Sequence, residues 1–455
     1  IVDGLKRLKV PETAASLVSL LALLVPIQMA GQTWDDHDRS GRYTCRDFGQ
    51  NYLNSMDAKG NPVIFTNGDN DTFPLWYNQE TEGVRTDARV CNLSYLQTDW
   101  YIDQMRRPAY DSPSLPISWT RLQYVTGTRE GIPVQPDALQ QVIDYYKDSP
   151  EDLKQMLGDN PYELKNIIRH WVLNDNPDLQ IFPTDSIVVT VDKEAVKRSG
   201  MMIAADSIPD VMHISLKGKR AVYKSEMMML EMISQANWER PLYMSTTVGP
   251  DNYGHLGDNF VQEGLACRIT PFDTKQSGRT IDSERMYNNM MNKFKYGGLK
   301  ENPDIYLDET VIRMCYTHRR LFNQLAQQLL KEGQKDKALK VLQRAEEEIP
   351  GSIVPHEAFY GHSLELADAW LALGHKAEAE KLLNAVGQNA KEYIEWYLSL
   401  NTQRLLQSSR ECLMQIYILN DIAKTWEPID KKKAETYRME VNNYASRCHQ
   451  RGMSL

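Results

Sequence analysis

A short apolar run that ends abruptly in polar turn residues constrains the fold of this chain most. Residues 62–66, Pro-Val-Ile-Phe-Thr, lead directly into the run Asn-Gly-Asp-Asn-Asp-Thr-Phe-Pro at 67–74. This order predicts a strand over 62–67, a polar turn, and a helix over 72–82 that Asp71 caps at its N-terminus. Because open α/β folds bind ligands where parallel strands end, the polar side chains of this turn are candidate binding groups.

The region 31–272 alternates strand and helix patterns, as α/β domains do. A stretch at about 108–182, Pro-rich at first and then helical, interrupts the alternation as an insertion, and the polar stretch 273–304 then reads as a linker. Two β–α units in close succession imply a parallel crossover, so we expect a mostly parallel sheet. Beyond the first strand and helix, we expect strands over 88–94, 186–192, 213–217, 241–246 and 264–270, and helices over 99–106 and 224–237.

The last part of the chain, 305–455, has the pattern of paired helices and contains a repeat. Gly333 and Ala338 in one segment correspond to Gly374 and Ala379 in the next, about 41 residues later, which is longer than a standard tetratricopeptide repeat. A Gly suits the turn between two antiparallel helices, and an Ala suits the point where they cross closely. We therefore expect a tetratricopeptide-like helical-repeat domain with its own core, without which the α/β domain would still fold.

The first thirty residues contain an apolar segment, and we treat 1–30 as a separate unit. Residues 14–30 carry no charge, and as a helix they would extend about 26 Å, slightly less than the roughly 30 Å of a bilayer core. The cations Lys6, Arg7 and Lys9 precede them. We interpret the segment as the end of a transmembrane region, with a signal peptide and a buried core helix as alternatives. In the first two cases everything after residue 31 lies outside the cytoplasm.

The composition excludes some classes of function. The formal net charge is −9 and no long basic block offsets it, so we expect no nucleic-acid partner. The six cysteines are scattered without a Cys-x-x-Cys pair, which fits neither a zinc ribbon nor a dithiol redox site. The chain also lacks the short motifs of serine hydrolases, P-loop proteins, dinucleotide-binding proteins and zinc proteases.

Two carboxylates in the first turn, Asp69 and Asp71, have the Asp-x-Asp spacing with which many nucleotide-sugar glycosyltransferases hold a divalent cation. Hard oxygen ligands of this kind suit Mg²⁺ or Mn²⁺. The alternative is structural: Asp71 caps the helix, while Asn67 and Asp69 build the turn.

A second dense polar cluster follows the apolar segment directly. Its acidic and imidazole groups could coordinate a metal, and its two guanidinium groups could hold a phosphate at the level of the lipid headgroups. The alternative is a salt-bridged junction between anchor and domain. The candidate residues are Asp36, His37, Asp38, Arg39 and Arg42.

Four further residues are candidates on weaker grounds. Trp76 and Trp100 recur at corresponding places in the two β–α units, where they could stack on a sugar, although packing of a helix face against the sheet is the favoured explanation. His255 lies in a Gly-bracketed loop and could act as an acid, a base or a ligand, and Glu263 follows next to Gly264.

Several of these segments together resemble a known family, domain of unknown function 2723. Its members are large inner-membrane proteins of Bacteroidota, related to eukaryotic protein O-mannosyltransferases of the transmembrane-260 type. The matching segments are Trp-Asp-Asp-His-Asp-Arg-Ser-Gly-Arg-Tyr at 34–43, Phe-Thr-Asn-Gly-Asp-Asn-Asp-Thr-Phe-Pro-Leu-Trp-Tyr at 65–77, Asn-Leu-Ser-Tyr-Leu at 92–96, Thr-Asp-Trp-Tyr-Ile at 98–102 and Glu-Gly-Leu-Ala at 263–266.

The resemblance implies a multi-spanning glycosyltransferase of the C type, which moves sugar from a polyprenyl-phosphate carrier to Ser or Thr of exported proteins. The catalytic acid of such an enzyme lies in an early extracytoplasmic loop, which this chain does not contain. This chain would then be a periplasmic lobe, inactive alone, whose helical repeats bind acceptor protein.

Two alternatives remain open at this point. One is a non-enzymatic, membrane-anchored scaffold for envelope proteins. The other is an independent metal-dependent glycosyltransferase that uses Asp69 and Asp71.

Overall fold

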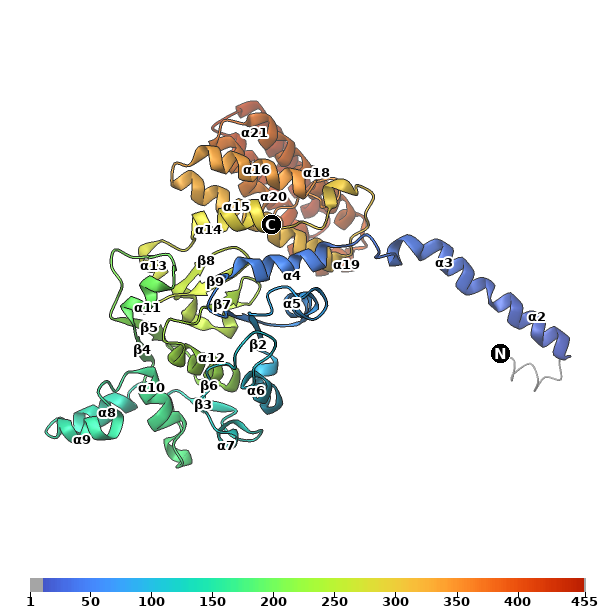
Figure 1. Ribbon diagram of the computed structural model, residues 1–455. Helices are drawn as coiled ribbons and strands as arrows, with labels where there is room; N and C mark the ends of the chain where they lie inside the picture. Colours follow the sequence, from blue (N-terminus) through green and yellow to red (C-terminus); the bar gives the residue numbers. More distant parts are fainter. Residues whose placement is uncertain (1–10, 454–455) are drawn as a thin grey trace.

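The computed structural model describes residues 11–453, which form a β-sheet region followed by an entirely helical tail (Figure 1). The strands are β1 Val63–Thr66, β2 Arg89–Asn92, β3 Gly131–Pro133, β4 Ser186–Thr190, β5 Val211–Ser215, β6 Ala221–Tyr223, β7 Leu242–Ser245, β8 Phe260–Gln262 and β9 Ala266–Ile269. The helices of this region, after the N-terminal segment, are α4 Thr44–Ser55, α5 Asp69–Glu82, α6 Asp99–Met105, α7 Arg121–Tyr124, α8 Ala138–Tyr145, α9 Pro150–Leu157, α10 Leu164–Ile167, α11 Lys193–Arg198, α12 Lys224–Gln235, α13 Thr274–Ser277 and α14 Ser283–Asn288.

The main sheet has five strands in the order β2-β1-β7-β9-β8. Strand β1 pairs in parallel with β2 and β7, whereas β9 pairs antiparallel with both β7 and β8. The expectation of a mostly parallel sheet is therefore wrong. The connection between β8 and β9 is a tight turn at Gly264, and so short a connection permits only antiparallel neighbours.

Two pairs of strands leave the main sheet altogether. The predicted strands over 186–192 and 213–217 are present as β4 and β5, but they form a separate antiparallel pair, and β3 pairs with β6 in the same way. The predicted helical insertion contains α8, α9 and α10, close to the expected positions.

Successive residues of strand β1, which has a neighbouring strand on each side, contribute to two different cores. Ile64 packs with Phe48 of α4 and Leu75 of α5, while Val63 and Phe65 pack with the apolar side chains of α6 and α12. This alternation is the period-2 geometry of a strand that is covered on both faces. Helix α4 lies between the sheet and the helical tail (Figure 1).

Helix α5 begins earlier than the sequence predicts. Gly68 precedes the first helical residue, Asp69, and it has a φ of 83°, which a Gly adopts without strain. Asp71 therefore lies inside the first turn and is not the N-cap residue, contrary to our expectation. Its carboxylate is consequently directed to other partners.

The tail consists mainly of helical pairs whose two helices pack against each other. Gly333 and Gly374 lie in the turns that follow α15 and α17, with φ of 75° and 83°, and Ala338 and Ala379 are completely buried. The predicted Gly turns and close Ala contacts are thus present, while the assignment to a particular repeat family stays a prediction. The helices are α15 Glu309–Lys331, α16 Lys335–Glu348, α17 Ser363–Ala372, α18 Lys376–Ser399, α19 Thr402–Gln407, α20 Ser409–Trp426 and α21 Lys431–Gln450.

The sheet region and the tail share one continuous hydrophobic core. Phe48 of α4 and Met286 of α14 belong to the same buried cluster as Phe322 of α15. His318 of α15 is also buried, where its Nε2 accepts a hydrogen bond from the side chain of Asn51 at 2.9 Å. The segment 273–304, expected as a linker, includes helices with buried side chains at this junction.

The N-terminal segment extends away from the rest of the molecule as α2 Glu12–Ala22 and α3 Leu24–His37 (Figure 1). Among the described residues, one stretch, Ser16–Trp34, is long and apolar enough to cross a membrane, and none of it is buried. A buried core helix does not fit this exposure. An anchor and a signal sequence both fit it.

Candidate functional site

The direction of α4 decides which edge of the sheet is closest to the apolar segment. Helix α4 ends just before the loop that enters β1, and its early residue Phe48 lies beside Asn67, which follows β1. Helix α4 therefore runs opposite to β1. As a result, the junction after α3 leads to the edge where β1, β2 and β7 end.

A cleft of about 240 Å³ lies at this edge of the sheet. One wall comes from α4, the start of α5 and the residues after β1 and β7, and the other comes from the first turns of α15. The two regions of the molecule thus form the cleft together. Its lining residues are Phe48, Asn67, Asn70, Asp71, Thr247, Thr310, Arg313, Met314 and Thr317.

Asp71 is the buried acid of this cleft. Its carboxylate accepts hydrogen bonds from the hydroxyls of Thr247 at 2.9 Å and Ser245 at 3.2 Å and from the backbone N–H of Asn67 at 3.3 Å. Burial raises the pKa of Asp71 above its ordinary value, although these three donors oppose the shift. The phenol of Tyr52 joins the same hydroxyls, and burial raises the pKa of Tyr52 to about 12.

Arg313 is the basic residue of the cleft. Its side chain is 59% exposed and pairs with Glu309 one turn earlier, and its guanidinium group lies over the ring of Tyr360, 5.6 Å from the ring centre. The amide of Asn67 and the hydroxyl of Thr317 line the cleft beside it, where the amide donates to the side chain of Asn252 at 3.4 Å and the hydroxyl donates to the carbonyl of Arg313 at 3.1 Å. The guanidinium group of Arg313 is therefore the lining group with which this cleft could hold an anion.

The sequence predicts Asn67 and Asp71 at this edge, and the structure brings both into the cleft. Thr247 and the α15 residues Thr310, Arg313 and Thr317 were not predicted. No local signal indicates the α15 residues, because α15 lies far along the chain and its position depends on packing against α4.

The divalent-cation hypothesis gains no support from this geometry. Asp69 is exposed and does not line the cleft, while Asp71 is engaged by hydroxyls and an N–H group. Within residues 11–453, no group of three or more His, Cys, Asp and Glu side chains is arranged to hold a metal ion.

Trp76 and Trp100 belong to a series of adjacent aromatic rings. Phe73 stacks on Trp76 at 5.7 Å, Trp76 on Tyr95 at 6.2 Å, and Tyr95 contacts Trp100 at 5.9 Å. Phe73 and Trp100, at the two ends, are 47% and 50% exposed. Both lie in the first turns of helices that follow parallel strands, so the exposed rings lie near the same edge as the cleft.

The polar cluster of the junction is extended along the chain and does not surround one point. His37 ends α3 and bonds to the carbonyl of Thr33, and Asp38 accepts hydrogen bonds from Ser40 that lower its pKa. Arg39 is exposed. The side chain of Asp36 lies outside the described part of the structure.

Arg42 connects the junction to the tail. Its guanidinium group lies over the ring of Tyr306 at 5.0 Å, immediately before α15, whose Arg313 lines the cleft. The junction therefore packs beside the start of α15.

His255 and Glu263 lie apart from the cleft. His255 is exposed in the 3₁₀ turn Gly254–Asn259 and lines a larger cleft of about 700 Å³ with His213, Asp258 and Arg279. Nothing in the geometry joins these groups to Asp71.

Glu263 is completely buried in an ionic network near the C-terminal end of α4. Arg285 approaches its carboxylate at 3.3 Å and Arg268 at 3.8 Å, both arginines also pair with Asp57, and Tyr243 donates a hydrogen bond to it at 2.9 Å. Burial raises the pKa of Glu263 to about 7, against the opposing effect of the two arginines. The enclosure indicates a structural group.

Comparison with known proteins identifies one family. The family model described as TMEM260-associated domain 2 matches residues 45–289, which is more than half of the chain. The matched part runs from α4 through α14, so it includes the sheet side of the cleft and excludes α15. No curated protein and no solved structure matches the chain.

Proposed function

Because this chain belongs to the family of the TMEM260-associated domain 2, we propose that it is the membrane-proximal lobe of a glycosyltransferase-like membrane protein. In this role the lobe binds the phosphate of a polyprenyl-phosphate-linked sugar, or the acceptor segment beside it. The transfer itself belongs to the membrane-embedded part, as the resemblance to C-type enzymes implies. The lobe alone would then be inactive, and it would face the periplasm from an inner membrane.

The orientation of the cleft supports this proposal most directly. The apolar stretch Ser16–Trp34 leads through the junction to the start of α4, which lies at the sheet edge that holds Asn67, Asp71 and Thr247. If the apolar stretch spans a membrane, the cleft lies on the side of the lobe that faces the bilayer. A lipid-linked phosphate could reach it there.

The chemistry of the cleft fits a phosphate ester. Arg313 supplies the positive charge, and the amide of Asn67, which has a second hydrogen besides the one it donates to Asn252, supplies a neutral donor beside it. A phosphate oxygen accepts such bonds readily, and bonds to charged groups are the stronger ones. Asp71 remains shielded by hydroxyls, which reduces its repulsion of an anion.

We propose further that the tail contacts acceptor proteins through exposed aromatic side chains. Tyr393 and Trp396 on α18 and Tyr417 on α20 are about half exposed. Flexible acceptor segments bind well to aromatic surfaces of this kind.

Binding of a short-chain polyprenyl phosphate to the chain in detergent micelles tests the carrier site. The Arg313→Ala variant is expected to bind at least about tenfold more weakly, because it loses a charge-assisted hydrogen bond to the phosphate. Isothermal titration calorimetry measures the affinity. Arg447→Ala is the matched control, since Arg447 also pairs with a helical Glu, Glu395, but lies on α21 away from the cleft.

Equal affinity of the wild type and Arg313→Ala would remove the carrier-phosphate role. An equal loss of affinity in Arg447→Ala would show that the weaker binding results from the change in overall charge. The unfolding midpoint of both variants should stay close to that of the wild type, because both arginines are exposed.

A further inference from the structure

Two cysteines face each other inside the last pair of helices. Cys412 on α20 and Cys448 on α21 are both completely buried, and their sulfur atoms are 3.9 Å apart. They are 36 positions apart in the sequence. The other four cysteines lie in different elements: Cys45 in α4, Cys91 in β2, Cys267 in β9 and Cys315 in α15.

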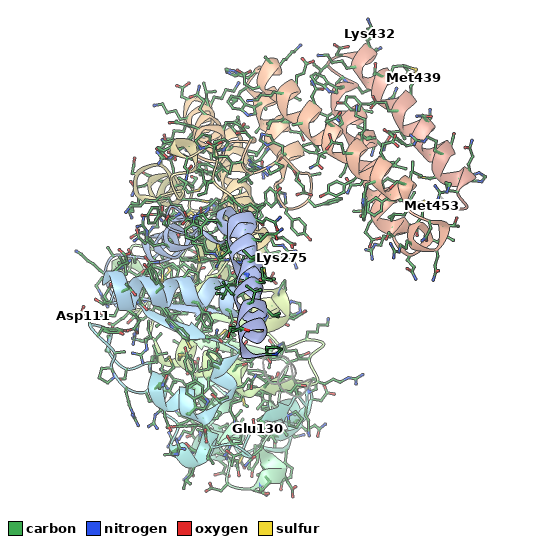
Figure 2. All side chains as sticks on the ribbon, turned by 90° about the vertical axis from the view of Figure 1, so that its right-hand side faces the viewer. Asp111, Glu130, Lys275, Lys432, Met439 and Met453 are labelled. Carbon is green, nitrogen blue, oxygen red and sulfur yellow. The ribbon has the colours of Figure 1, made fainter. Side chains whose placement is uncertain are left out.

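The two cysteines lie at the end of the α20–α21 hairpin that is opposite to its connecting turn. Cys412 is in the first turn of α20, and Cys448 is in the last turn of α21, whereas the turn that connects the helices lies at their other ends. Figure 2 shows α21 from Lys432, near its start, to Met453, just beyond its end. The two thiols therefore lie at the open end of the hairpin, where no covalent connection holds the helices together.

The same end of the hairpin is already held by other contacts. Arg451 donates hydrogen bonds to the carbonyls of Leu398 and Leu400 at the end of α18, at 2.6 and 2.7 Å, and Met453 is buried. The backbone around Cys448 is thus positioned against the neighbouring helices. A disulfide bond of roughly 2.05 Å requires the two sulfur atoms, which are 3.9 Å apart here, to approach by about 2 Å.

Metal binding does not explain the pair. Zinc and other soft metals in structural sites take four ligands, and within residues 11–453 no group of three His, Cys, Asp and Glu side chains is arranged for one. The pair also lies apart from the cleft, so the proposed carrier binding does not use it.

We propose that Cys412 and Cys448 form a disulfide that closes the open end of the terminal helical hairpin. The oxidant is a donor disulfide, such as that of a thiol oxidase or of oxidised glutathione. One cysteine thiolate attacks the donor and forms a mixed disulfide, which releases one donor thiol. The second cysteine thiolate then displaces the second donor thiol, so that two protons and two electrons leave the protein and the donor disulfide is reduced to two thiols.

Burial determines when this reaction takes place. It raises the pKa of Cys412 to about 12 and also raises that of Cys448, so neither thiol ionises readily in the folded hairpin. Oxidation therefore occurs before α21 packs on α20, or during transient opening of this terminal helix. Once the hairpin closes, the bond is protected from reductants in solution.

The full chain in detergent micelles, incubated in a buffer of oxidised and reduced glutathione, tests the proposal. Free thiols are blocked with N-ethylmaleimide in denaturant, and peptide mapping by mass spectrometry identifies the linked cysteines. We expect a peptide that joins Cys412 to Cys448 as the dominant product. It should resist dithiothreitol until denaturant is added.

The oxidised protein should also unfold at a midpoint at least about 4 °C higher than the reduced protein, because the bond closes a long loop. This difference should vanish in the Cys412→Ala/Cys448→Ala variant and persist in Cys45→Ser. Comparing oxidised and reduced samples of the same variant removes any packing cost of the substitution itself.

Complete alkylation of both cysteines after oxidation, or a mixture of pairings among all six, would overturn the proposal. So would a linked pair whose oxidation leaves the midpoint unchanged. Because none of these measurements uses the cleft, they are independent of the result with Arg313→Ala.

Discussion

The sheet region and the helical tail maintain their structures in different ways. The sheet region buries charged groups that meet from distant parts of the chain: Glu263 and Arg268 are buried, and their partners Asp57 and Arg285 are partly buried. The tail buries mainly aliphatic and small side chains between helices that follow each other directly, such as Ala338 and Ala379. The first depends on long-range partners, and the second depends on local helix pairs.

From this difference we expect substitutions to affect the stability of the two regions differently. Removing one partner of a buried ion pair lowers the free energy of unfolding by several kcal/mol, because the remaining charge has no water to solvate it. A helical repeat instead distributes its stability over neighbouring contacts of similar size. The regions meet at α4 and α15, where His318 lies among the rings of Phe48, Phe294 and Tyr296.

Removal of the tail is expected to have the largest effect. Truncation after residue 304 exposes the face of α4 that packs on α15, including Phe48, so the remaining sheet region should lose cooperative unfolding. This outcome reverses our expectation from sequence, because the shared core was not visible there. Calorimetry and near-UV circular dichroism measure it.

A shorter truncation after residue 408 is the control. It removes α20 and α21 and leaves α15 in place, so the sheet region should still unfold cooperatively. A sharp transition in the longer truncation would show that the sheet region folds independently after all.

Substitution of Arg268 is expected to have the next largest effect. Arg268→Met leaves the buried Glu263 and the partly buried Asp57 with Arg285 alone, and should reduce the free energy of unfolding by about 3–5 kcal/mol. In the tail, Arg447→Met removes only an exposed pair and should cost less than about 1 kcal/mol. Urea denaturation measures the free energy of unfolding of both variants. Similar losses in the two variants would contradict the contrast between the regions.

Acid should weaken the junction between the regions through His318. Burial lowers its pKa from 6.5 to about 3, so below pH 6.5 the unfolded state binds a proton that the folded state excludes. The stability is complete above pH 6.5 and is lost progressively towards pH 3. At pH 4.5 the loss amounts to at most about 3 kcal/mol.

The His318→Gln variant isolates this effect, because Gln can accept the hydrogen bond from Asn51 and does not titrate. Glu263 titrates in the opposite sense: its pKa of about 7 is raised, so its contribution is present below pH 4.5 and is lost as the pH rises through 7. Both proteins contain Glu263, so its contribution cancels when the free energy of unfolding of the variant is subtracted from that of the wild type at each pH. If the stability of the two proteins depended on pH in the same way, the loss of stability in acid would not come from His318.

Much of the secondary structure was predictable because it depends on local patterns. The β-branched run before Asn67 predicts β1, and the apolar periodicity over 224–237 predicts α12. In the tail, Gly333 and Gly374 mark turns that have positive φ, as their spacing predicts. Each of these inferences uses residues within one or two helical turns of each other.

The candidate site was predictable only in part. The position of Asn67 and Asp71 at the end of a parallel strand follows from the order of strand, turn and helix. The buried state of Asp71 and its hydroxyl partners Ser245 and Thr247 do not, because β7 pairs with β1 across more than 170 residues of intervening chain. Arg313 enters the cleft only because α15 packs on α4.

Local order in the amino-acid chain thus defines the strands, the helices, the Gly turns and the apolar N-terminal stretch, since backbone preference and periodicity act over short distances. Long-range packing defines the mixed sheet, the shared core and the cleft between Asp71 and Arg313. Those features arise when apolar faces of distant segments are buried together, and the energy of that burial depends on all of the partners at once.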